Sequence, residues 1–321
     1  MTAAVPTLPA FADVLSAAAR IAPHAQRTPT LRSQSLDEIA GCTLHFKCEN
    51  LQRVGAFKAR GASNAVLSLD GDARRRGVVT HSSGNHAAAL ALAARNAGIP
   101  AWVVMPRNAP LPKVESVRRL GGEIVFCEPT LEAREATCAE VGARTGATLV
   151  HPYDDHAVIA GQGTATLELV EQVGVLDAVV VPVGGGGLLA GTSVVGRALG
   201  IDVYGAEPEA VDDAARSLAT GVRQPPTGGT TAADGLRTAL GARPFEIIRR
   251  NVTGIVTVSE AEIVAAMRLV WEVMKIVIEP SSAVPVAALL ERRLPAAGRR
   301  VGVILTGGNV DLDALPWAGA R

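Results

Sequence analysis

The stretch Asp177-Ala-Val-Val-Val-Pro-Val-Gly-Gly-Gly-Gly-Leu-Leu189 decides the fold class of this 321-residue chain. Residues 177–183 form a nearly uninterrupted apolar run, which is typical of a strand buried on both faces of a parallel sheet. Four glycines follow, and then a helix is expected over 188–199 and a second strand over 201–206. This order predicts a β–α–β unit of an α/β fold.

The same order of strand, loop and helix recurs on both sides of this stretch. Strands are expected over 77–80, 101–105, 124–127, 147–150 and 300–305, and helices over 87–97, 113–120 and 131–144. Such alternation favours parallel sheets with right-handed crossovers. The segment 221–229 is dense in Pro and Gly and is expected to be a surface loop.

Composition and charge exclude several classes of function. The chain is 48% hydrophobic and 19% charged, which supplies a large core and no signature of disorder. Lys plus Arg and Asp plus Glu each number 31, so the zero net charge argues against binding to nucleic acid by phosphate neutralisation. Apolar stretches fall short of the ~18 residues of a membrane span, and no signal-peptide pattern begins the chain. Because the four cysteines lack metal-ligand spacing, we expect a cytoplasmic protein with reduced thiols.

Three short polar loops each follow an expected strand. They are 82–85 (Ser-Ser-Gly-Asn), 184–187 (four glycines) and 306–309 (Thr-Gly-Gly-Asn). In open α/β sheets, ligands bind outside the carboxyl ends of the strands, so these loops are expected to converge on one small molecule. Glycine lets the backbone approach a ligand, and N–H groups at a helix N-terminus favour an anion. The glycine loop therefore predicts a phosphate cradle.

Two features give different predictions for the ligand. The stretch 185–190 fits a dinucleotide-binding pattern, with Glu207 in the place of the ribose-binding acid, and this would predict an NAD-dependent oxidoreductase. That interpretation leaves the other two loops unexplained. Lys58 lies beside Phe57 among small residues. A lysine in apolar surroundings has a lowered pKa and can act as an amine nucleophile or base.

At these residues the chain resembles the fold-type II pyridoxal-phosphate enzymes, in the serine/threonine dehydratase and serine racemase branch. The family patterns occur in family order, as Ala56-Phe-Lys-Ala-Arg-Gly-Ala62, Ser82-Ser-Gly-Asn-His86, His151-Pro-Tyr-Asp-Asp155, Gly184 to Gly187 and Thr306-Gly-Gly-Asn309. The resemblance implies a fold like that of the tryptophan synthase beta subunit, with two open parallel-sheet domains and the cofactor between them. Residues 1–76 and 153–321 would form a large pyridoxal-phosphate-binding domain, and residues 77–152 a small inserted one.

The resemblance also implies a cofactor site. Lys58 would form a Schiff base with pyridoxal 5'-phosphate and, once freed, take the Cα proton of the substrate. Asn85 would bind the cofactor's 3-hydroxyl, and Thr306, where most family members have Ser, its pyridine nitrogen. The further cofactor-binding residues implied are Phe57, Gly184, Gly185, Gly186, Gly187, Gly235 and Glu279.

Substrate contacts follow from the same resemblance. The substrate carboxylate would bind at the Ser82 to His86 loop, through Ser82, Ser83, Asn85 and His86, at a helix N-terminus where anions are favoured. Arg134 and Thr238 are further candidates, although Arg134 also fits an exposed helix charge. A serine at Ser83, on the face of the cofactor opposite Lys58, would permit racemisation without proving it.

A cation site is a further implication. Glu207, the Val211 carbonyl and Asp213 would bind Mg2+ or Ca2+, which prefer hard oxygen ligands. The alternative for these residues is a solvated acidic turn.

The activity implied is β-elimination of water from L-threonine or L-serine, which releases 2-oxobutanoate or pyruvate with ammonia. Two alternatives within the family are a serine racemase with dehydratase side activity and a 3-hydroxyaspartate dehydratase. A cofactor-free binding protein and an NAD-dependent oxidoreductase are the alternatives from other classes. The expected partners are a small hydroxy amino acid and further copies of the chain, as a homodimer or homotetramer, with no nucleic acid and no membrane.

Overall fold

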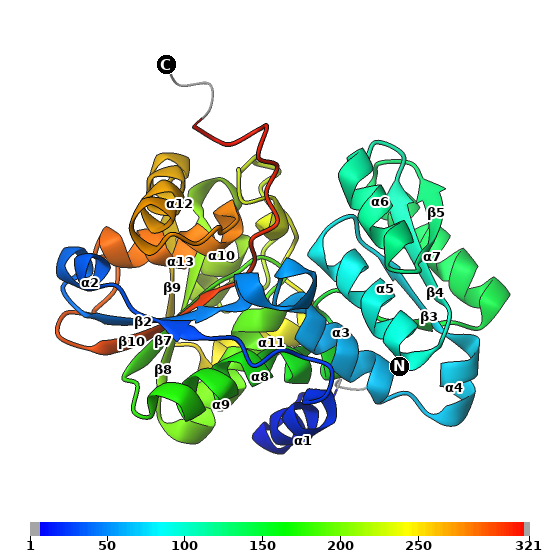
Figure 1. The fold of residues 1–321 in the computed structure, drawn as a ribbon, viewed down its shortest axis with the longest axis horizontal. Helices are drawn as coiled ribbons and strands as arrows, with labels where there is room; N and C mark the ends of the chain where they lie inside the picture. Colours follow the sequence, from blue (N-terminus) through cyan, green and yellow to red (C-terminus); the bar gives the residue numbers. More distant parts are fainter. Residues whose placement is uncertain (1–6, 318–321) are drawn as a thin grey trace.

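Two mostly parallel sheets, each covered by helices, lie side by side in the protein (Figure 1). The computed structural model describes residues 7–317. One sheet has six strands in the order β1-β2-β10-β7-β8-β9, and the other has four in the order β5-β4-β3-β6. Neighbouring strands pair in parallel except β1 and β2, which pair antiparallel. The α/β class with two open parallel sheets is therefore confirmed.

The strands have the following bounds. The six-stranded sheet contains β1 (Thr30–Leu31), β2 (Thr43–Cys48), β7 (Ala178–Pro182), β8 (Asp202–Pro208), β9 (Gly254–Val258) and β10 (Arg300–Leu305). The four-stranded sheet contains β3 (Val78–His81), β4 (Ala101–Pro106), β5 (Glu123–Cys127) and β6 (Thr148–Leu149).

The α-helices divide between the two sheets. Those around the large sheet are α1 (Phe11–Ile21), α2 (Gln34–Ala40), α3 (Lys58–Leu67), α8 (His156–Val173), α9 (Gly187–Leu199), α10 (Asp213–Thr220), α11 (Ala242–Asn251), α12 (Glu260–Met274) and α13 (Pro280–Leu290). Those around the small sheet are α4 (Gly71–Arg76), α5 (Asn85–Ala97), α6 (Leu111–Arg119) and α7 (Leu131–Thr145).

The predicted unit around the glycine loop is present as β7, α9 and β8. Helix α9 begins one residue earlier than expected, at Gly187, because Gly186 has a positive φ of 87° and turns the chain into the helix. It ends at Leu199 and is followed by Gly200, which adopts the left-handed conformation common after a helix. Strand β8 continues two residues beyond the expected end, because Glu207 and Pro208 still pair with β9.

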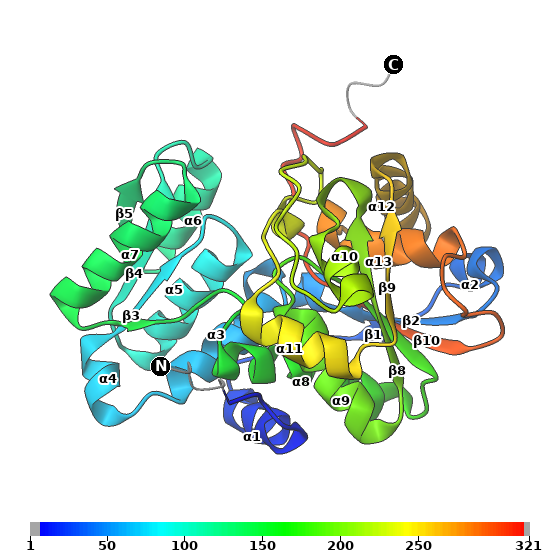
Figure 2. The same cartoon turned by 180° about the vertical axis from the view of Figure 1, so that it is seen from behind.

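The large sheet is buried on both faces, which explains the apolar run of β7. Val180 packs in the core with α2, α12 and α13, whereas Val179 and Val181 pack in the opposite core with α8, α9 and α11. The side chains of a strand alternate between the faces, so every residue of a doubly covered strand is apolar. Figure 2 shows the protein from behind, with the face that carries α9 and α11 toward the viewer.

The small sheet is built in the same way. Val103 and Met105 of β4 pack with α5 and α6, and Val104 packs with α7 on the other face. Helix α5 begins at Asn85, two residues earlier than expected, because Gly84 already serves as its N-cap. Asn85 and His86 therefore lie in its first turn.

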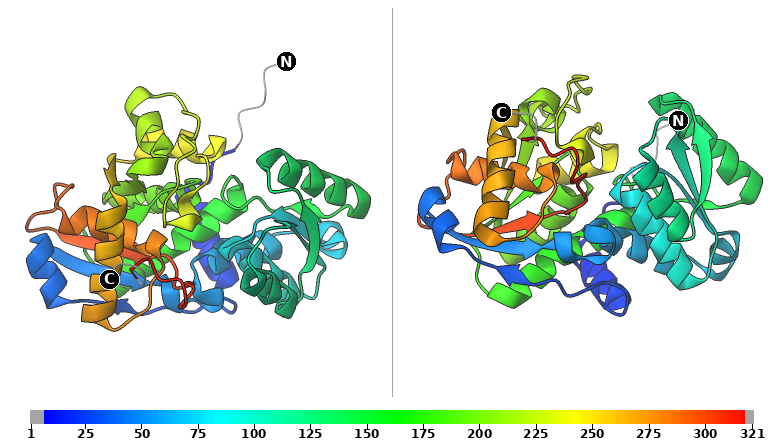
Figure 3. Two further views of the ribbon diagram at one scale, coloured as in Figure 1. Left: turned by 90° about the horizontal axis from the view of Figure 1, so that it is seen from above. Right: turned by 45° about the horizontal axis from the view of Figure 1, so that its top comes forward.

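Helix α3 joins the two halves. Its residues Ala62, Ala65 and Val66 share a core with Leu90 of α5 and Val158 of α8. In both views of Figure 3 the small sheet and its helices stand beside the large sheet. The division at residues 77 and 152 stays a prediction. Within residues 7–317, no helix combines the length and the apolar character that a membrane crossing requires.

Candidate active site

The three predicted loops follow β3, β7 and β10, and side chains from two of them touch. The Asn309 Nδ2 atom donates to Asn85 Oδ1 at 2.9 Å, although the two residues are far apart in sequence. The segment before α3 joins them, because the Phe57 N–H donates to the Thr306 carbonyl at 2.9 Å. The sheet topology therefore brings Lys58, Asn85 and Thr306 to one place.

Lys58 is the first residue of α3 and is partly buried. Its Nζ atom donates to the Pro152 carbonyl at 2.8 Å and lies 5.1 Å from the centroid of the Phe57 ring. Burial lowers the pKa of Lys58 to about 8, against the opposing effect of the Glu279 carboxylate. About a tenth of the amine is therefore uncharged at pH 7, far more than for an ordinary lysine, as a nucleophile or base requires.

Glu279 is a buried carboxylate between the loops. Both of its oxygens lie 3.1 Å from Asn85 Nδ2, and one accepts the Asn309 N–H at 3.3 Å. Burial raises the pKa of Glu279 to about 7. With Asn309 Nδ2 bonded to the other end of the Asn85 amide, the orientation of that amide is determined on both sides.

Thr306 lies at the end of β10 and is buried. Its Oγ1 atom is 3.0 Å from Ser282 Oγ. The Ser282 hydroxyl donates to the Gly307 carbonyl at 2.8 Å and accepts the Gly307 N–H at 2.8 Å. Ser282 therefore orients the Thr306 hydroxyl, a role that sequence reasoning missed because it followed the motif Thr306 to Asn309 alone.

The glycine loop fits a phosphate group. Residues 184–187 are buried, and the N–H groups of Gly185, Gly186 and Gly187 form no hydrogen bond with another residue in the range 7–317. Buried backbone donors need a partner, and a phosphate at a helix N-terminus supplies one. A Cβ at Gly184 would lie 2.8 Å from Leu236 Cα, so the loop leaves no room for side chains. The residues present therefore fit the cofactor that the resemblance implies.

The remaining predicted contacts on the large-sheet side lie near this loop. Thr238 is exposed, and its Oγ1 atom would be 3.1 Å from a Cβ at Gly184. Gly235 lies in a short 3-10 helix (Asp234–Leu236), where a Cβ would lie 3.0 Å from Ser281 Oγ.

The loop after β3 presents free polar groups. Ser82 Oγ accepts the Gly84 N–H at 3.3 Å, whereas the Ser83 hydroxyl and the N–H groups of Asn85 and His86 bond to no other residue that the structure describes. These groups at the start of α5 can bind a carboxylate. The His86 side chain turns away, because its Nε2 atom lies 3.2 Å from the Val150 carbonyl. His86 can therefore contact the substrate only through its backbone N–H group.

Three neutral histidines surround this loop. Burial is the main cause that lowers the pKa of His81, of His86 and, to about 4, of His151. The rings of His81 and His151 meet edge to face at 5.5 Å, and those of His151 and Tyr153 at 4.6 Å. The imidazoles therefore add no positive charge near Lys58 at neutral pH.

Arg134, in the first turns of α7, is a cation without a counter-ion. It forms no ion pair with any described residue, and its Nε atom is buried without a hydrogen-bond partner in the same part of the chain. After burial and the opposing charge of Glu135, its charge is a further influence on the pKa of His81, the residue immediately before Ser82, and lowers it. Arg134 therefore differs from an ordinary exposed helix charge.

The predicted cation ligands are buried. Glu207 is 0% and Asp213 2% exposed, so the alternative of a solvated acidic turn is wrong. The Glu207 oxygens accept the N–H groups of Ala214 and Ala215 at 3.1 and 2.9 Å, and Asp213 Oδ2 accepts the Leu240 N–H at 2.8 Å. A cavity of about 60 Å³ lies beside these residues, and Val211, Asp213 and Thr238 are among the residues that line it.

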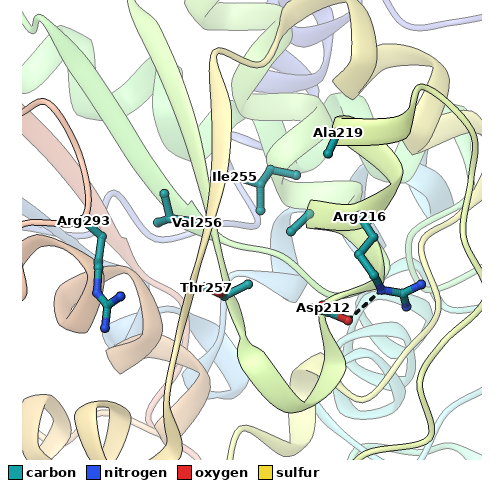
Figure 4. Close-up of a pocket in the computed structure, with 8 residues that line it drawn as sticks. Asp212, Arg216, Ala219, Ile255, Val256, Thr257 and Arg293 are labelled. Carbon is teal, nitrogen blue, oxygen red and sulfur yellow. Dashed lines mark hydrogen bonds and ion pairs between the residues drawn. The ribbon is translucent and has the colours of Figure 1, made fainter.

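A larger cavity, of about 480 Å³, borders the segment of the predicted cation ligands, because its lining includes Asp212 and Ala215 (Figure 4). It is lined by Asp212, Ala215, Arg216, Ala219, Ile255, Val256, Thr257 and Arg293. Its arginines already have partners, since Arg216 pairs with Asp212 at 2.8 Å and Arg293 with Glu262 at 2.6 Å. None of the predicted site residues lines it.

Known proteins resemble this chain over nearly its whole length. A beta-hydroxyaspartate dehydratase from Paracoccus denitrificans (strain Pd 1222) is 53% identical over 312 residues, which cover 97% of this chain and 99% of the relative. The crystal structure of serine racemase from Dictyostelium discoideum has a TM-score of 0.91 at 46% identity, covering 95% of this chain and 99% of that one. The crystal structure of a threonine deaminase from T.th. has a TM-score of 0.88 at 45% identity, with coverages of 95% and 99%.

The family follows from this similarity together with the site. The model of the family described as "PALP: Pyridoxal-phosphate dependent enzyme" matches residues 21–307, which include Lys58, the glycine loop and Thr306. The fold-type II architecture that the resemblance implied is confirmed by the solved relatives. The chain belongs to the pyridoxal-phosphate dependent enzyme family.

Proposed function

We propose that this chain is a pyridoxal-phosphate-dependent ammonia-lyase whose preferred substrate is a 3-hydroxyaspartate. The reaction removes water across Cα and Cβ and releases oxaloacetate and ammonia. The observation that carries the substrate preference is the guanidinium of Arg134, which forms no ion pair with a described residue and acts electrostatically on His81, the residue before Ser82. The similarity to a beta-hydroxyaspartate dehydratase supports the same substrate.

The charge of the substrate explains the preference. Each 3-hydroxyaspartate carries two carboxylates, whereas serine and threonine carry one. The free N–H groups at the start of α5 can hold the first carboxylate. In this proposal Arg134 neutralises the second, and a bidentate bond from a guanidinium to a carboxylate is among the stronger hydrogen bonds in proteins. Thr238, beside the glycine loop, is a further candidate for a substrate contact through its hydroxyl.

The described residues can carry out the proton transfers. Pyridoxal phosphate, when bound, supplies an electron sink that stabilises negative charge at Cα. Lys58 Nζ, with its pKa lowered to about 8, takes the Cα proton. The C–O bond at Cβ then breaks with both electrons on oxygen, and the hydroxide takes the proton held by Lys58 Nζ and leaves as water. The released enamine becomes an imine, which water hydrolyses to oxaloacetate and ammonia.

Serine is the second candidate substrate, with either racemisation or elimination as the outcome. The Ser83 hydroxyl bonds to no other described residue. It is therefore free to exchange a proton with Cα of the substrate, on the face of the cofactor opposite Lys58 where the resemblance puts it. The predicted elimination from L-serine and L-threonine remains an alternative, supported by the similarity to a threonine deaminase.

Two further parts of the proposal concern binding partners. Glu207, the Val211 carbonyl and Asp213 bind Mg2+ or Ca2+, since burial raises the pKa of Glu207 to about 9 and a cation would compensate two buried carboxylates. The chain also associates with itself, as a homodimer or homotetramer.

The test is a substrate panel with wild type and two variants of Arg134. Release of oxaloacetate, pyruvate and 2-oxobutanoate is measured from 3-hydroxyaspartate, L-serine and L-threonine. Arg134→Gln should raise KM for 3-hydroxyaspartate by about 10- to 100-fold, because a charge-assisted bond is lost, and leave KM for L-serine within about threefold. For Arg134→Lys, KM for 3-hydroxyaspartate should lie between the values of the wild type and of Arg134→Gln. Equal effects of Arg134→Gln on both substrates would contradict the proposal.

A further inference from the structure

The connection from the small sheet to the large one contacts both Lys58 and the glycine loop. It consists of residues 151–155, between β6 and α8. The Pro152 carbonyl accepts from Lys58 Nζ at 2.8 Å. Asp154 accepts the N–H groups of Ala242 and Arg243, at 2.9 and 3.1 Å, at the start of α11. The middle residue, Tyr153, lies on the glycine loop.

Tyr153 occupies the space that side chains at two of the glycines would need. A Cβ at Gly185 would overlap Tyr153 Cγ and Cδ1, at a separation well below the 3.0 Å under which real Cβ contacts essentially do not occur. A Cβ at Gly187 would lie 3.0 Å from Tyr153 Cα and Cβ. Any larger residue at Gly185 would therefore force the ring to move.

Backbone conformation does not explain these two glycines. Gly186 has a φ of +87°, which L side chains rarely adopt, whereas Gly185 and Gly187 have no φ in this range. Gly186 is thus required by its dihedral angle, and Gly185 and Gly187 by the space that Tyr153 fills. This differs from the sequence interpretation, in which glycine serves the approach of the phosphate.

The Tyr153 ring also packs against the His151 ring. The His151 ring meets it at 4.6 Å with an angle of 87° between the planes. The Asp154 N–H donates to His151 Nδ1 at 2.9 Å, which fixes the imidazole. On the other side of the loop, the Gly241 N–H donates to the Gly185 carbonyl at 3.1 Å. The Tyr153 hydroxyl bonds to no other residue among those described, so the ring carries the contact.

We infer that Tyr153 is a positioning residue for the cofactor: its ring packs against Gly185, its backbone and Cβ pack against Gly187, and these contacts hold the N–H groups of both glycines in the geometry that binds phosphate. A site arranged before the ligand arrives loses less free energy on binding. The inference concerns the cofactor and applies whichever hydroxy amino acid the enzyme uses.

The test is a double-mutant cycle read by cofactor titration of apo-protein, with absorbance and fluorescence of bound pyridoxal phosphate as signals. Gly185→Ala should weaken cofactor binding by about tenfold or more, because the methyl group overpacks against the ring. Tyr153→Ala should also weaken binding, and Tyr153→Phe should bind within about twofold of wild type. In the Tyr153→Ala background, adding Gly185→Ala should reduce cofactor affinity by less than about twofold, because the ring against which the methyl group would pack is absent.

The matched control is a second tyrosine–glycine pair within residues 7–317. A Cβ at Gly254 would lie 3.6 Å from Tyr204 Cδ1, an ordinary contact, so Gly254→Ala should leave cofactor binding unchanged. Circular dichroism confirms that each variant is folded. If Gly185→Ala reduces cofactor affinity by the same factor with and without the Tyr153 ring, Gly185 is needed for the approach of the phosphate itself and the inference is wrong. Because no substrate enters the titration, this outcome is separate from failure of the proposed function.

Discussion

Lys58 Nζ donates a 2.8 Å hydrogen bond to the carbonyl of Pro152, in the connection between the two sheets. The amine to which the resemblance assigns the Schiff base is thus bonded to the segment that also carries Tyr153 and Asp154.

Removing the amine tests its role as nucleophile and base. Lys58→Ala should abolish covalent attachment of pyridoxal phosphate and reduce turnover by several orders of magnitude, because one group serves two steps. Noncovalent binding through the glycine loop should remain. Absorbance of the purified variant and single-turnover assays measure both, and near wild-type turnover would be incompatible with the assignment.

The lowered pKa of Lys58 predicts the pH dependence of cofactor capture by the apo-protein. Attack on the cofactor aldehyde requires the uncharged amine, and the pKa of this group lies at about 8. The capture rate should therefore fall about tenfold per pH unit below 8 and level off above it. Stopped-flow absorbance between pH 6 and pH 10 measures this profile. A rate that still rises steeply at pH 10 would indicate an ordinary lysine.

Glu279 provides a second test of the same profile. Its carboxylate raises the pKa of Lys58 against the effect of burial. Glu279→Gln removes this charge and retains an oxygen that can accept from Asn85 Nδ2. The break in the capture profile should therefore move to lower pH, with Glu140→Gln, at an exposed position of α7, as the control. A break that stays in place would show that the Glu279 charge does not act on Lys58.

Ser83→Ala separates racemisation from elimination. If the wild type forms D-serine from L-serine, the variant should lose that activity at least about tenfold more than pyruvate formation, because only inversion needs a proton donor on the second face. Chiral chromatography and keto-acid release are measured on the same samples. Equal losses would assign Ser83 to substrate positioning alone.

Chelation tests the cation site. A cation held by Glu207, the Val211 carbonyl and Asp213 stabilises the folded state by mass action. Chelator should lower Tm by several degrees and Mg2+ or Ca2+ should restore it. Glu207→Gln should have a lowered Tm that added metal does not raise. Unchanged melting with chelator, and no copurifying metal, would leave the two carboxylates as acceptors of backbone N–H groups alone.

The sequence predicts the sheets well and the site only in part, for physical reasons. Alternation of Val179, Val180 and Val181 between two cores is a local pattern, so β7 could be predicted from it. The bonds of Glu279 to Asn85, and the packing of Tyr153 on Gly185, join residues distant in sequence. They depend on how two sheets pack, which no local pattern encodes. The burial of Glu207 could not be predicted for the same reason.

The most direct test of the central claim is the ratio of kcat/KM values of the cofactor-loaded wild type for 3-hydroxyaspartate and for L-serine and L-threonine. A charge-assisted bond between Arg134 and the second carboxylate predicts a preference of about 10- to 100-fold for 3-hydroxyaspartate, with oxaloacetate and ammonia released in equal amounts. An equal or higher kcat/KM for L-serine or L-threonine would contradict the account.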